Sequence, residues 1–270
     1  MLLSTCNSAF SNEKVGFKLI SYNIWQTKNI FSTLNNTICS TFKLRCNNNQ
    51  ANDLINIIIS KNPEIFVLQE ASIDFINQLN QSNPEYFSFY SEKSSLAIFS
   101  KFDFISNSYT PFPSYMNRGM ILSKLLINKQ EICLVNTHLE SLLDDIESRK
   151  RQLTIIFKKL SSCDISILAG DFNFSDNSEE QSKIPSYFHD SWLINKQDPG
   201  FTYNLENNAL AHKNALYREN SRRLDRIFYT GNFFTINSIT LLGTKSPTPS
   251  DHYGLIAKFN FLNSSLLPKR

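Results

Sequence analysis

Residues 165–173 read ISILAGDFN, a short apolar run that leads directly into Gly170, Asp171 and Asn173. An apolar run of this length without alternation is typical of a strand buried on both faces. The acid and the amide that follow it would then lie at the end of a rigid strand, where a site can be preorganised. An Asx turn is the alternative interpretation of Asp171 and Asn173, because both side chains commonly bond to nearby backbone.

The same arrangement, a polar residue at one end of an apolar strand, recurs in both directions along the chain. It gives Asn23 in Phe17–Trp25, Glu70 after Glu64–Gln69, His138 after Glu131–Thr137, Asp225 in Leu224–Tyr229, and Asp251 with His252 before Leu255–Phe261. Taken singly, each has a structural reading, such as a satisfied buried amide, a helix N-terminal acid or a loop cap. Six such strand ends together indicate one shared polar site.

The remaining elements follow from periodicity and turn signals. Strands are predicted at Ser94–Ser100 and Met120–Ile127, helices at Asn52–Lys61 and Asp144–Leu160, and mostly loop at Asn35–Asn49 and Gln197–Arg223. Many strands, few helices and no linker indicate one α/β (α+β) domain with two packed sheets and helices outside. We expect this domain to span residues 17–262, with tails at 1–16 and 263–270.

Composition excludes several classes of protein. Of the 270 residues, 41% are hydrophobic and 19% charged, which is incompatible with a disordered chain. The net charge of +3 permits a phosphate-bearing partner without requiring one. No apolar run reaches about 18 residues, so we expect no transmembrane segment. Residues 1–10 lack the basic start of a secretory signal.

The cysteines bear on location. There are 5, an odd number, and none forms a CxxC motif. We therefore expect free thiols in a reducing, cytoplasmic setting, with a disulfide framework as the alternative and non-classical export left open. Heavy use of Asn, Lys, Ile and Phe, whose codons are AT-rich, indicates a low-GC genome, and we expect a bacterial one. We expect a monomer.

The clustered carboxylates favour hydrolysis at phosphorus. Buried acids need partners, and Mg²⁺ is an economical one because it takes one or two carboxylates and keeps waters for substrate oxygens. Zinc is disfavoured, since no Cys/His set has ligand spacing. In such a site Glu70 would hold the metal, an aspartate would deprotonate water, and a histidine would stabilise the transition state. Acyl transfer and P-loop chemistry lack their motifs.

In their order along the chain, the six motifs resemble the endonuclease/exonuclease/phosphatase superfamily. They are SYNIW at 21–25, LQE at 68–70, NTHLES at 136–141, GDFN at 170–173, RLDRIF at 223–228 and SDH at 250–252. The resemblance implies a four-layer αββα sandwich and a phosphoesterase that uses Mg²⁺, with Mn²⁺ as the alternative.

Within the superfamily, the chain is most similar to the type-2 tyrosyl-DNA phosphodiesterases, which are DNA-repair enzymes. The similarity lies in PFPS at 111–114, HLES at 138–141, FTY at 201–203 and PSDHYGL at 249–255. It implies a nucleic-acid substrate with a 5′ adduct. Ser175 departs from the family, which carries an arginine there, and the segment Gln26–Gln50 has no match. A phospholipid phosphodiesterase, an inositol-phosphate phosphatase and a non-catalytic binding module are the alternatives.

The resemblance also implies a role for each matched residue. Asn23, Glu70 and Asp251 would bind or position the metal. Asp171 would be the general base, and Asn173 would orient water or the scissile phosphate. His138 and His252 would stabilise the phosphorane, with Asp225 and Asp251 supporting His252 or the metal. Arg118, Ser141, Tyr203 and Tyr253 would contact substrate.

Overall fold

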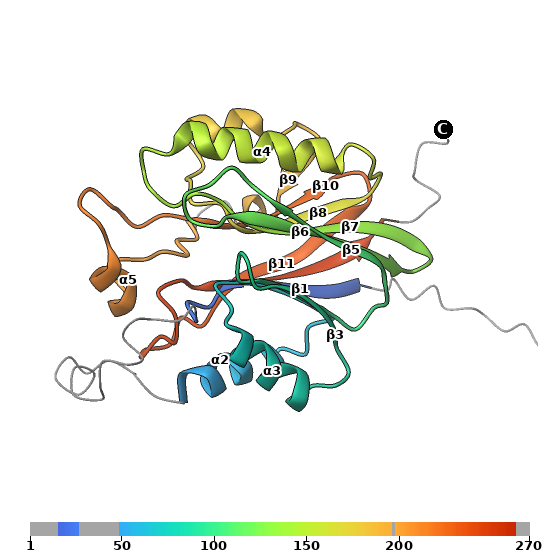
Figure 1. Ribbon diagram of the computed structural model, residues 1–270, viewed down its shortest axis with the longest axis horizontal. Coiled ribbons are helices and arrows are strands. Elements are labelled where there is room, and N and C mark those ends of the chain that lie inside the picture. The colour runs from blue at the N-terminus through green and yellow to red at the C-terminus, as the bar shows by residue number, and fades with distance from the viewer. Residues whose placement is uncertain (1–15, 27–48, 196–197, 263–270) are drawn as a thin grey trace, which may run out of the picture.

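Two β-sheets pack face to face, and helices cover their outer faces (Figure 1). The computed structural model describes residues 16–26, 49–195 and 198–262. The tail at 263–270 and nearly all of the tail at 1–16 and of the loop at Asn35–Asn49 lie outside this range, as do Cys6, Cys39 and Cys46. The predicted two-sheet α/β sandwich is confirmed.

Each sheet has six strands. The first sheet contains, in spatial order, β11 (Phe234–Leu242), β12 (Gly254–Phe261), β1 (Gly16–Asn23), β2 (Ile65–Gln69), β4 (Leu96–Ser100) and β3 (Phe87–Ser91). The second contains β5 (Phe104–Pro111), β6 (Gly119–Ile127), β7 (Gln130–His138), β8 (Ser166–Asp171), β10 (Asp225–Thr230) and β9 (Phe188–Asp190). Both sheets are mixed, because β1–β2 and β7–β8 pair in parallel and the other neighbours are antiparallel.

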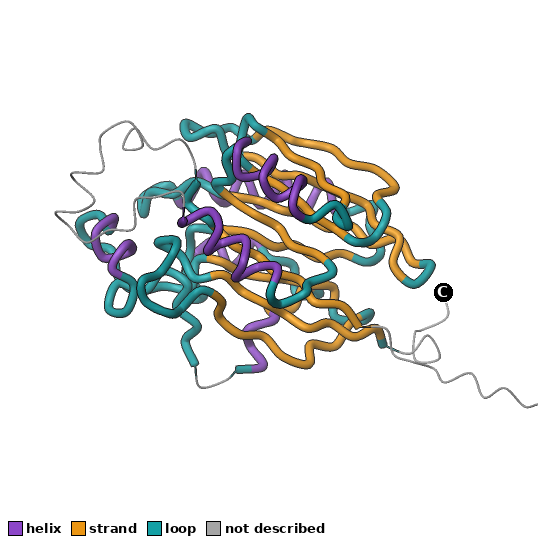
Figure 2. The backbone as a smooth tube through the Cα atoms, turned by 90° about the horizontal axis from the view of Figure 1, so that it is seen from below, coloured by secondary structure: helices purple, strands orange, loops and turns teal. Residues whose placement is uncertain are grey.

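Helices form the two outer layers. They are α2 (Asn49–Ile59), α3 (Ile73–Ser82) and α4 (Ile146–Leu160). The short α5 (Ala209–Asn214) lies at one end of the sandwich (Figure 1), and the chain also forms the 3₁₀ turns η2 (Glu179–Lys183) and η3 (Ser191–Ile194). Figure 2, seen from below, shows helices lying over the strands. Helices α2 and α3 cover the first sheet, whereas α4 covers the second (Figure 1). No helix in the described part of the chain is long and apolar enough to cross a membrane.

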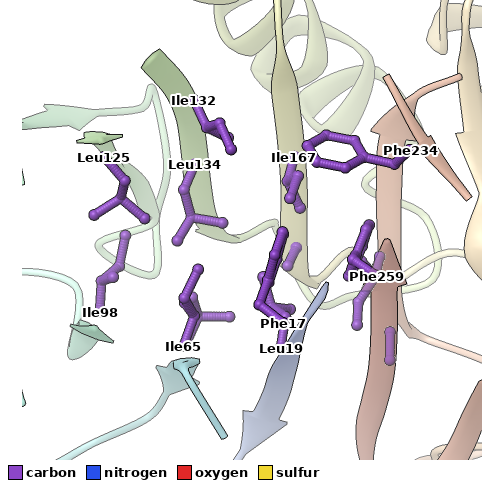
Figure 3. Close-up of a cluster of buried hydrophobic side chains, with 14 of the residues drawn as sticks. Phe17, Leu19, Ile65, Ile98, Leu125, Ile132, Leu134, Ile167, Phe234 and Phe259 are labelled. Carbon is purple, nitrogen blue, oxygen red and sulfur yellow. The ribbon is translucent and has the colours of Figure 1, made fainter. Parts of the chain in front are cut away.

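Alternation along β1 shows how one strand serves two cores. Phe17 and Leu19 point into the layer between the sheets, where they meet Ile65, Ile98, Leu134 and Ile167 (Figure 3). Ile20 and Tyr22 point to the opposite face, in the cluster that includes residues of α2 and α3. Because successive strand side chains face opposite sides, a strand with both faces covered reads as continuously apolar, which is why the sequence revealed it.

The strands that the sequence did not predict all lie at sheet edges: β3, β5, β9 and β11. An edge strand needs no continuous apolar run, because part of its surface faces solvent. In β5 the exposed residues include Ile105 and Ser106, and in β11 they include Thr235 and Asn237. Helix α5, within the predicted loop at 197–223, is too short to show a clear helical period.

Cys133 of β7 is bonded to Cys163, which follows α4. The prediction of free thiols is therefore wrong for this pair. An odd cysteine count with no CxxC motif could not reveal it, because the partners are 30 residues apart in sequence and meet only when α4 folds back onto the sheet.

Candidate active site

The polar residues meet because of how the strands run. Parallel strands end at the same edge of a sheet, so β1 and β2 end side by side at Asn23 and Gln69, and β7 and β8 at His138 and Asp171. Strand β10 is antiparallel to β8 and begins there, with Asp225 opposite Asp171. The predicted convergence of strand ends is confirmed.

Asp171 lies at the centre of the site. Its Oδ2 accepts a hydrogen bond from Nδ2 of Asn23 at 3.0 Å, and it lies 3.4 Å from Nε2 of His138 and 3.8 Å from Nε2 of His252. Its Oδ1 accepts from the backbone amide of Asn173 at 3.0 Å. The Asx-turn interpretation is therefore confirmed, and it uses only Oδ1; the functional interpretation, which would use Oδ2, stays a prediction.

The backbone around the site adopts unusual conformations. Gly170 has φ 145°, and a Cβ there would lie 2.0 Å from the carbonyl oxygen of Thr137, so only glycine lets β8 approach β7 this closely. Trp25, Glu70 and Asn173 have φ of 50°, 54° and 55°. For residues other than glycine this left-handed conformation costs about 1–2 kcal/mol each. Such strain is common at functional sites, where surrounding contacts enforce it.

His252 is paired with an acid. Its Nδ1 lies 2.7 Å from Oδ2 of Asp225, and the amide of Asp225 donates to Oγ1 of Thr202 at 3.0 Å. Burial by itself would lower the pKa of His252, but the charges of Asp225 and Asp171 outweigh it and raise that pKa well above its usual value. The ring therefore carries a proton on Nε2 as well as Nδ1, and it presents a positive charge to the site.

His138 contacts a positively charged residue instead. Nη1 of Arg118 lies 2.8 Å from Nδ1 of His138, and Nη2 of Arg118 donates to Oγ of Ser141. Because a guanidinium can only donate, Nδ1 accepts and the ring proton is on Nε2, facing Asp171. Burial and the charge of Arg118 hold the pKa of His138 well below its usual value, so this imidazole is neutral.

Glu70 and Asp251 form the acidic side of the site. Nδ2 of Asn23 lies 3.4 Å from Oε1 of Glu70, and Asp251 accepts from Nδ2 of Asn214 at 3.0 Å. Burial and the charge of Asp251 raise the pKa of Glu70. Helix α3 begins at Ile73 and is capped by Ser72, so Glu70 is not its N-terminal acid. A half-buried carboxylate and a buried one that repel each other are a suitable environment for a divalent cation.

A second cluster of side chains could also bind a metal ion. One ligand atom each from Asp171, Asp225 and His252 lie within 4.8 Å of one another. The 2.7 Å contact between His252 and Asp225, however, already uses a nitrogen and an oxygen of this group. The hard oxygen donors of Glu70, Asp251 and Asn23 fit Mg²⁺ or Mn²⁺ better, because a cation held there would leave the ion pair between His252 and Asp225 intact.

Comparisons with known proteins agree with this geometry. The family model described as "Endonuclease/Exonuclease/phosphatase family" matches residues 20–252. This chain belongs to that family. Tyrosyl-DNA phosphodiesterase 2 of Xenopus laevis is 30% identical over 178 residues, which are 60% of this chain and 47% of that protein. The human protein of the same name is 27% identical over 220 residues, 74% and 60% of the two chains. This chain thus spans about half the length of such relatives.

Solved structures show the same fold. That of Danio rerio TDP2 complexed with single-strand DNA product superposes with a TM-score of 0.74 at 22% identity, covering 91% of this chain and 99% of that one. A Bacteroides thetaiotaomicron protein of the endonuclease/exonuclease/phosphatase family gives 0.71 at 17% identity, covering 92% and 98%. The predicted family resemblance and αββα sandwich are confirmed.

The four residues predicted to contact substrate differ in how they lie relative to the site. Arg118 and Ser141 bond to each other at the site, as described. The ring of Tyr203 lies 5.2 Å from that of His252, centroid to centroid. Tyr253 is 3% exposed, with its amide donating to the carbonyl of Thr202, so it packs under the site. Substrate contact by these residues stays a prediction.

Several residues of the site were not predicted in these roles. Thr202 accepts from the amides of Leu224 and Asp225, and Asn214 of α5 bonds Asp251. Nδ2 of Asn173 donates to the carbonyl of Leu139, which ties the turn after β8 to the end of β7. These are bonds to backbone or between distant loops, which leave no spacing signal in a sequence.

Proposed function

We propose that the protein is a divalent-metal-dependent phosphodiesterase that hydrolyses a 5′-phosphotyrosyl linkage to nucleic acid. The observation that carries the proposal is Asp171, held between a neutral and a protonated histidine beside the Glu70–Asp251 pair. The substrate class is supported by the names of the similar proteins, tyrosyl-DNA phosphodiesterase 2.

In this proposal Asp171 accepts the proton of the attacking water. Burial alone would raise the pKa of Asp171, but the charges of protonated His252 and of Arg118 and the hydrogen bond from Asn23 lower it, so the carboxylate is ionised and ready to accept. Protonated His252 donates from Nε2 to an oxygen of the phosphorane, where negative charge develops. Asp225 keeps that imidazolium charged and oriented.

On the other side of Asp171 from His252, three residues would hold the phosphate in place: His138, Arg118 and Ser141. His138 donates from Nε2 while its Nδ1 accepts from Arg118. Arg118 adds a fixed positive charge near the substrate phosphate, and Ser141 orients it. His138 and Arg118 would both stabilise the negatively charged oxygens of the phosphate, and neither would transfer a proton.

Glu70 and Asp251, with Asn23, would hold Mg²⁺ or Mn²⁺. A divalent cation there supplies Lewis-acid polarisation of a phosphate oxygen. Glu70→Gln removes one of the two acids, so we expect a higher Mg²⁺ concentration for half-maximal activity, measured by metal titration after EDTA treatment. An unchanged metal requirement would contradict this assignment.

The deciding experiment is hydrolysis of a 5′-phosphotyrosyl oligonucleotide with Mg²⁺, with and without EDTA. We expect release of tyrosine, an oligonucleotide with a 5′-phosphate, and loss of activity in EDTA. An abasic duplex and a panel of sphingomyelin, phosphoinositides and inositol phosphates are the comparison substrates. Turnover of only one of these would keep the site and discard the tyrosyl linkage, and no turnover at all would favour a binding module.

Location and assembly are tested separately. The cytoplasmic assignment drew on free thiols, and disulfides such as Cys133–Cys163 are typical of oxidising compartments. Alkylation of the native protein without reductant, followed by mass measurement, shows whether this pair is bonded in the cell of origin. A monomer remains our expectation, to be checked by light scattering.

A further inference from the structure

One wall of the site is formed by the chain between Thr202 and Arg222. Three contacts fix this wall against the catalytic residues. Oγ1 of Thr202 accepts from the amide of Asp225 at 3.0 Å. The ring of Tyr203 lies 5.2 Å from that of His252. Nδ2 of Asn214 donates to Asp251 at 3.0 Å.

Arg222 ends this wall and is held in a defined position. Its amide donates to the carbonyl of Tyr203 at 2.8 Å, and the amide of Tyr203 donates back at 3.0 Å. Its side chain is only 14% exposed. The backbone pairing therefore places Arg222 beside the residue that contacts His252.

The guanidinium of Arg222 retains unused donors. Only Nη2 bonds to Glu219, through one contact of 3.1 Å, and Nε is buried with no hydrogen-bond partner among the described residues. An arginine has five N–H donors, and a buried donor without an acceptor is costly. A ligand can reach only a donor that keeps some exposure, and Nη1 is such a donor, because it bonds to no described residue and is not one of the buried unpaired atoms.

Charges connect Arg222 to the catalytic centre. Burial lowers the pKa of Arg222, and the charges of Glu219 and Asp171 act in the opposite direction. Asp171 acts in the same way on Arg118, whose Nε is likewise buried with no hydrogen-bond partner in the described part of the chain. Two arginines with free donors thus lie within electrostatic reach of Asp171.

We propose that Arg222 binds a second phosphate of the substrate, adjacent to the one that is hydrolysed. The planar guanidinium fork matches phosphate geometry, and the first phosphate lies with Arg118 and the two histidines. This inference rests on the proposed phosphodiesterase function of the site. It makes the enzyme selective for substrates with at least two neighbouring phosphates.

A purely structural ion pair with Glu219 is the competing explanation. Glu219 has a task of its own, since its Oε2 accepts from the amide of Leu216 at 2.8 Å. If Arg222 only holds Glu219, then removing either charge should have the same effect. If Arg222 binds phosphate, Glu219→Gln should free the guanidinium and leave binding at least as tight.

The test measures binding by fluorescence anisotropy with Mg²⁺ in the hydrolysis-deficient Asp171→Asn background. The probes are a 5′-phosphotyrosyl oligonucleotide and the same strand with an uncharged methylphosphonate at its first internucleotide linkage. Arg222→Gln should weaken binding of the charged probe about tenfold, the size of a lost charge-assisted bond, and that of the methylphosphonate probe several-fold less. Arg222→Lys should recover part of the loss, and thermal melts check folding.

Equal losses on both probes, a Glu219→Gln variant that matches Arg222→Gln, or no binding of either probe would overturn the inference. Competition by inositol 1-phosphate and inositol 1,4-bisphosphate distinguishes the source of the second phosphate. A preference for the bisphosphate that depends on Arg222 indicates a headgroup, and selectivity seen only with oligonucleotides indicates a nucleic acid. If the tyrosyl linkage is not hydrolysed but the Arg222-dependent selectivity stands, the proposed reaction fails and this inference survives.

Discussion

A histidine lies on each side of Asp171, and the two histidines differ in charge state. His138 lies against Arg118 and is neutral, whereas His252 lies against Asp225 and is protonated. Both rings are buried, so burial alone would make both neutral. The difference shows that one charged neighbour decides whether a buried imidazole carries a proton, and that one site can therefore hold two different hydrogen-bond donors.

The largest expected effect comes from removing the residue that both sides share. Asp171→Asn keeps the shape of the side chain but removes its negative charge and its ability to accept a proton. We expect kcat to fall by about 10²–10⁴-fold, as for loss of a general base, in a tyrosine-release assay. An unchanged circular dichroism spectrum is the control, and full activity would contradict the assignment of Asp171 as the base.

The next effect concerns the support of the His138 side. Buried Arg149 of α4 pairs with Glu180 at 2.7 Å and also donates to the carbonyls of Glu140, Leu142 and Leu143. It thus secures the backbone around Ser141. Arg149→Met leaves Glu180 buried without its partner, so we expect a loss of about 3–5 kcal/mol in the free energy of unfolding, measured by urea titration.

The double replacement Arg149→Met with Glu180→Leu is the matched control for this prediction. It removes both charges, so it should recover much of the stability while the carbonyls around Ser141 stay unsupported. If the single and double variants are equally unstable, the ion pair is not the source of the loss.

The His252 side has a smaller, uncharged support. Oγ1 of Thr202 accepts from the amides of Leu224 and Asp225. Thr202→Val has nearly the same shape but cannot accept, so two buried amides lose their partner. We expect a loss of about 1–3 kcal/mol in unfolding free energy, together with lower activity. Thr202→Ser keeps the hydroxyl and should lose less, and equal losses in the two variants would point to packing.

The smallest effect tests the charge states themselves. Arg118→Gln removes a cause of the low pKa of His138, so that pKa should rise toward its usual value, as followed by NMR titration of the ring protons. Arg118→Lys keeps the charge and should leave the pKa of His138 low. A pKa of His138 that is the same in all three proteins would refute the pairing.

This change also predicts the pH dependence of stability. Because folded His138 has a lower pKa than unfolded histidine, the unfolded chain binds more protons below about pH 6.5. The contribution of His138 to stability is therefore present above that pH and lost as the pH falls. In Arg118→Gln the loss should be smaller, which urea titrations at pH 7.5 and 5.5 measure.

The sequence revealed the centre of the fold and not its edges. Strands β1, β2, β7 and β8 are buried on both faces, so their apolar runs and the polar residues that end them are visible in the sequence. The edge strands β5 and β11 carry exposed polar residues and look like loops. Periodicity reports burial, and the edges of a sandwich are only partly buried.

The site was predictable where strands deliver it. Asp171, His138 and Asp225 follow from strand ends, and α/β packing brings such ends together. Arg222, Asn214 and Thr202 lie in the long connection before β10, where no period fixes their position. Their roles depend on contacts with residues such as Asp251 and His252, which only the folded chain defines.

A buried pair of amide side chains, Gln69 and Asn136, joins the two sheets. Nε2 of Gln69 donates to Oδ1 of Asn136 at 2.7 Å, and Nδ2 of Asn136 donates to the carbonyls of Leu68 and Ala97 at 2.8 Å. An interface made only of apolar side chains would tolerate sliding of one sheet over the other, because apolar contacts have no preferred orientation. The Gln69–Asn136 pair resists such sliding, because any offset between the sheets would leave several buried polar groups without hydrogen-bond partners. This amide pair therefore fixes the alignment of the two sheets, and with it the positions of the site residues on β1 and β2 relative to those on β7 and β8.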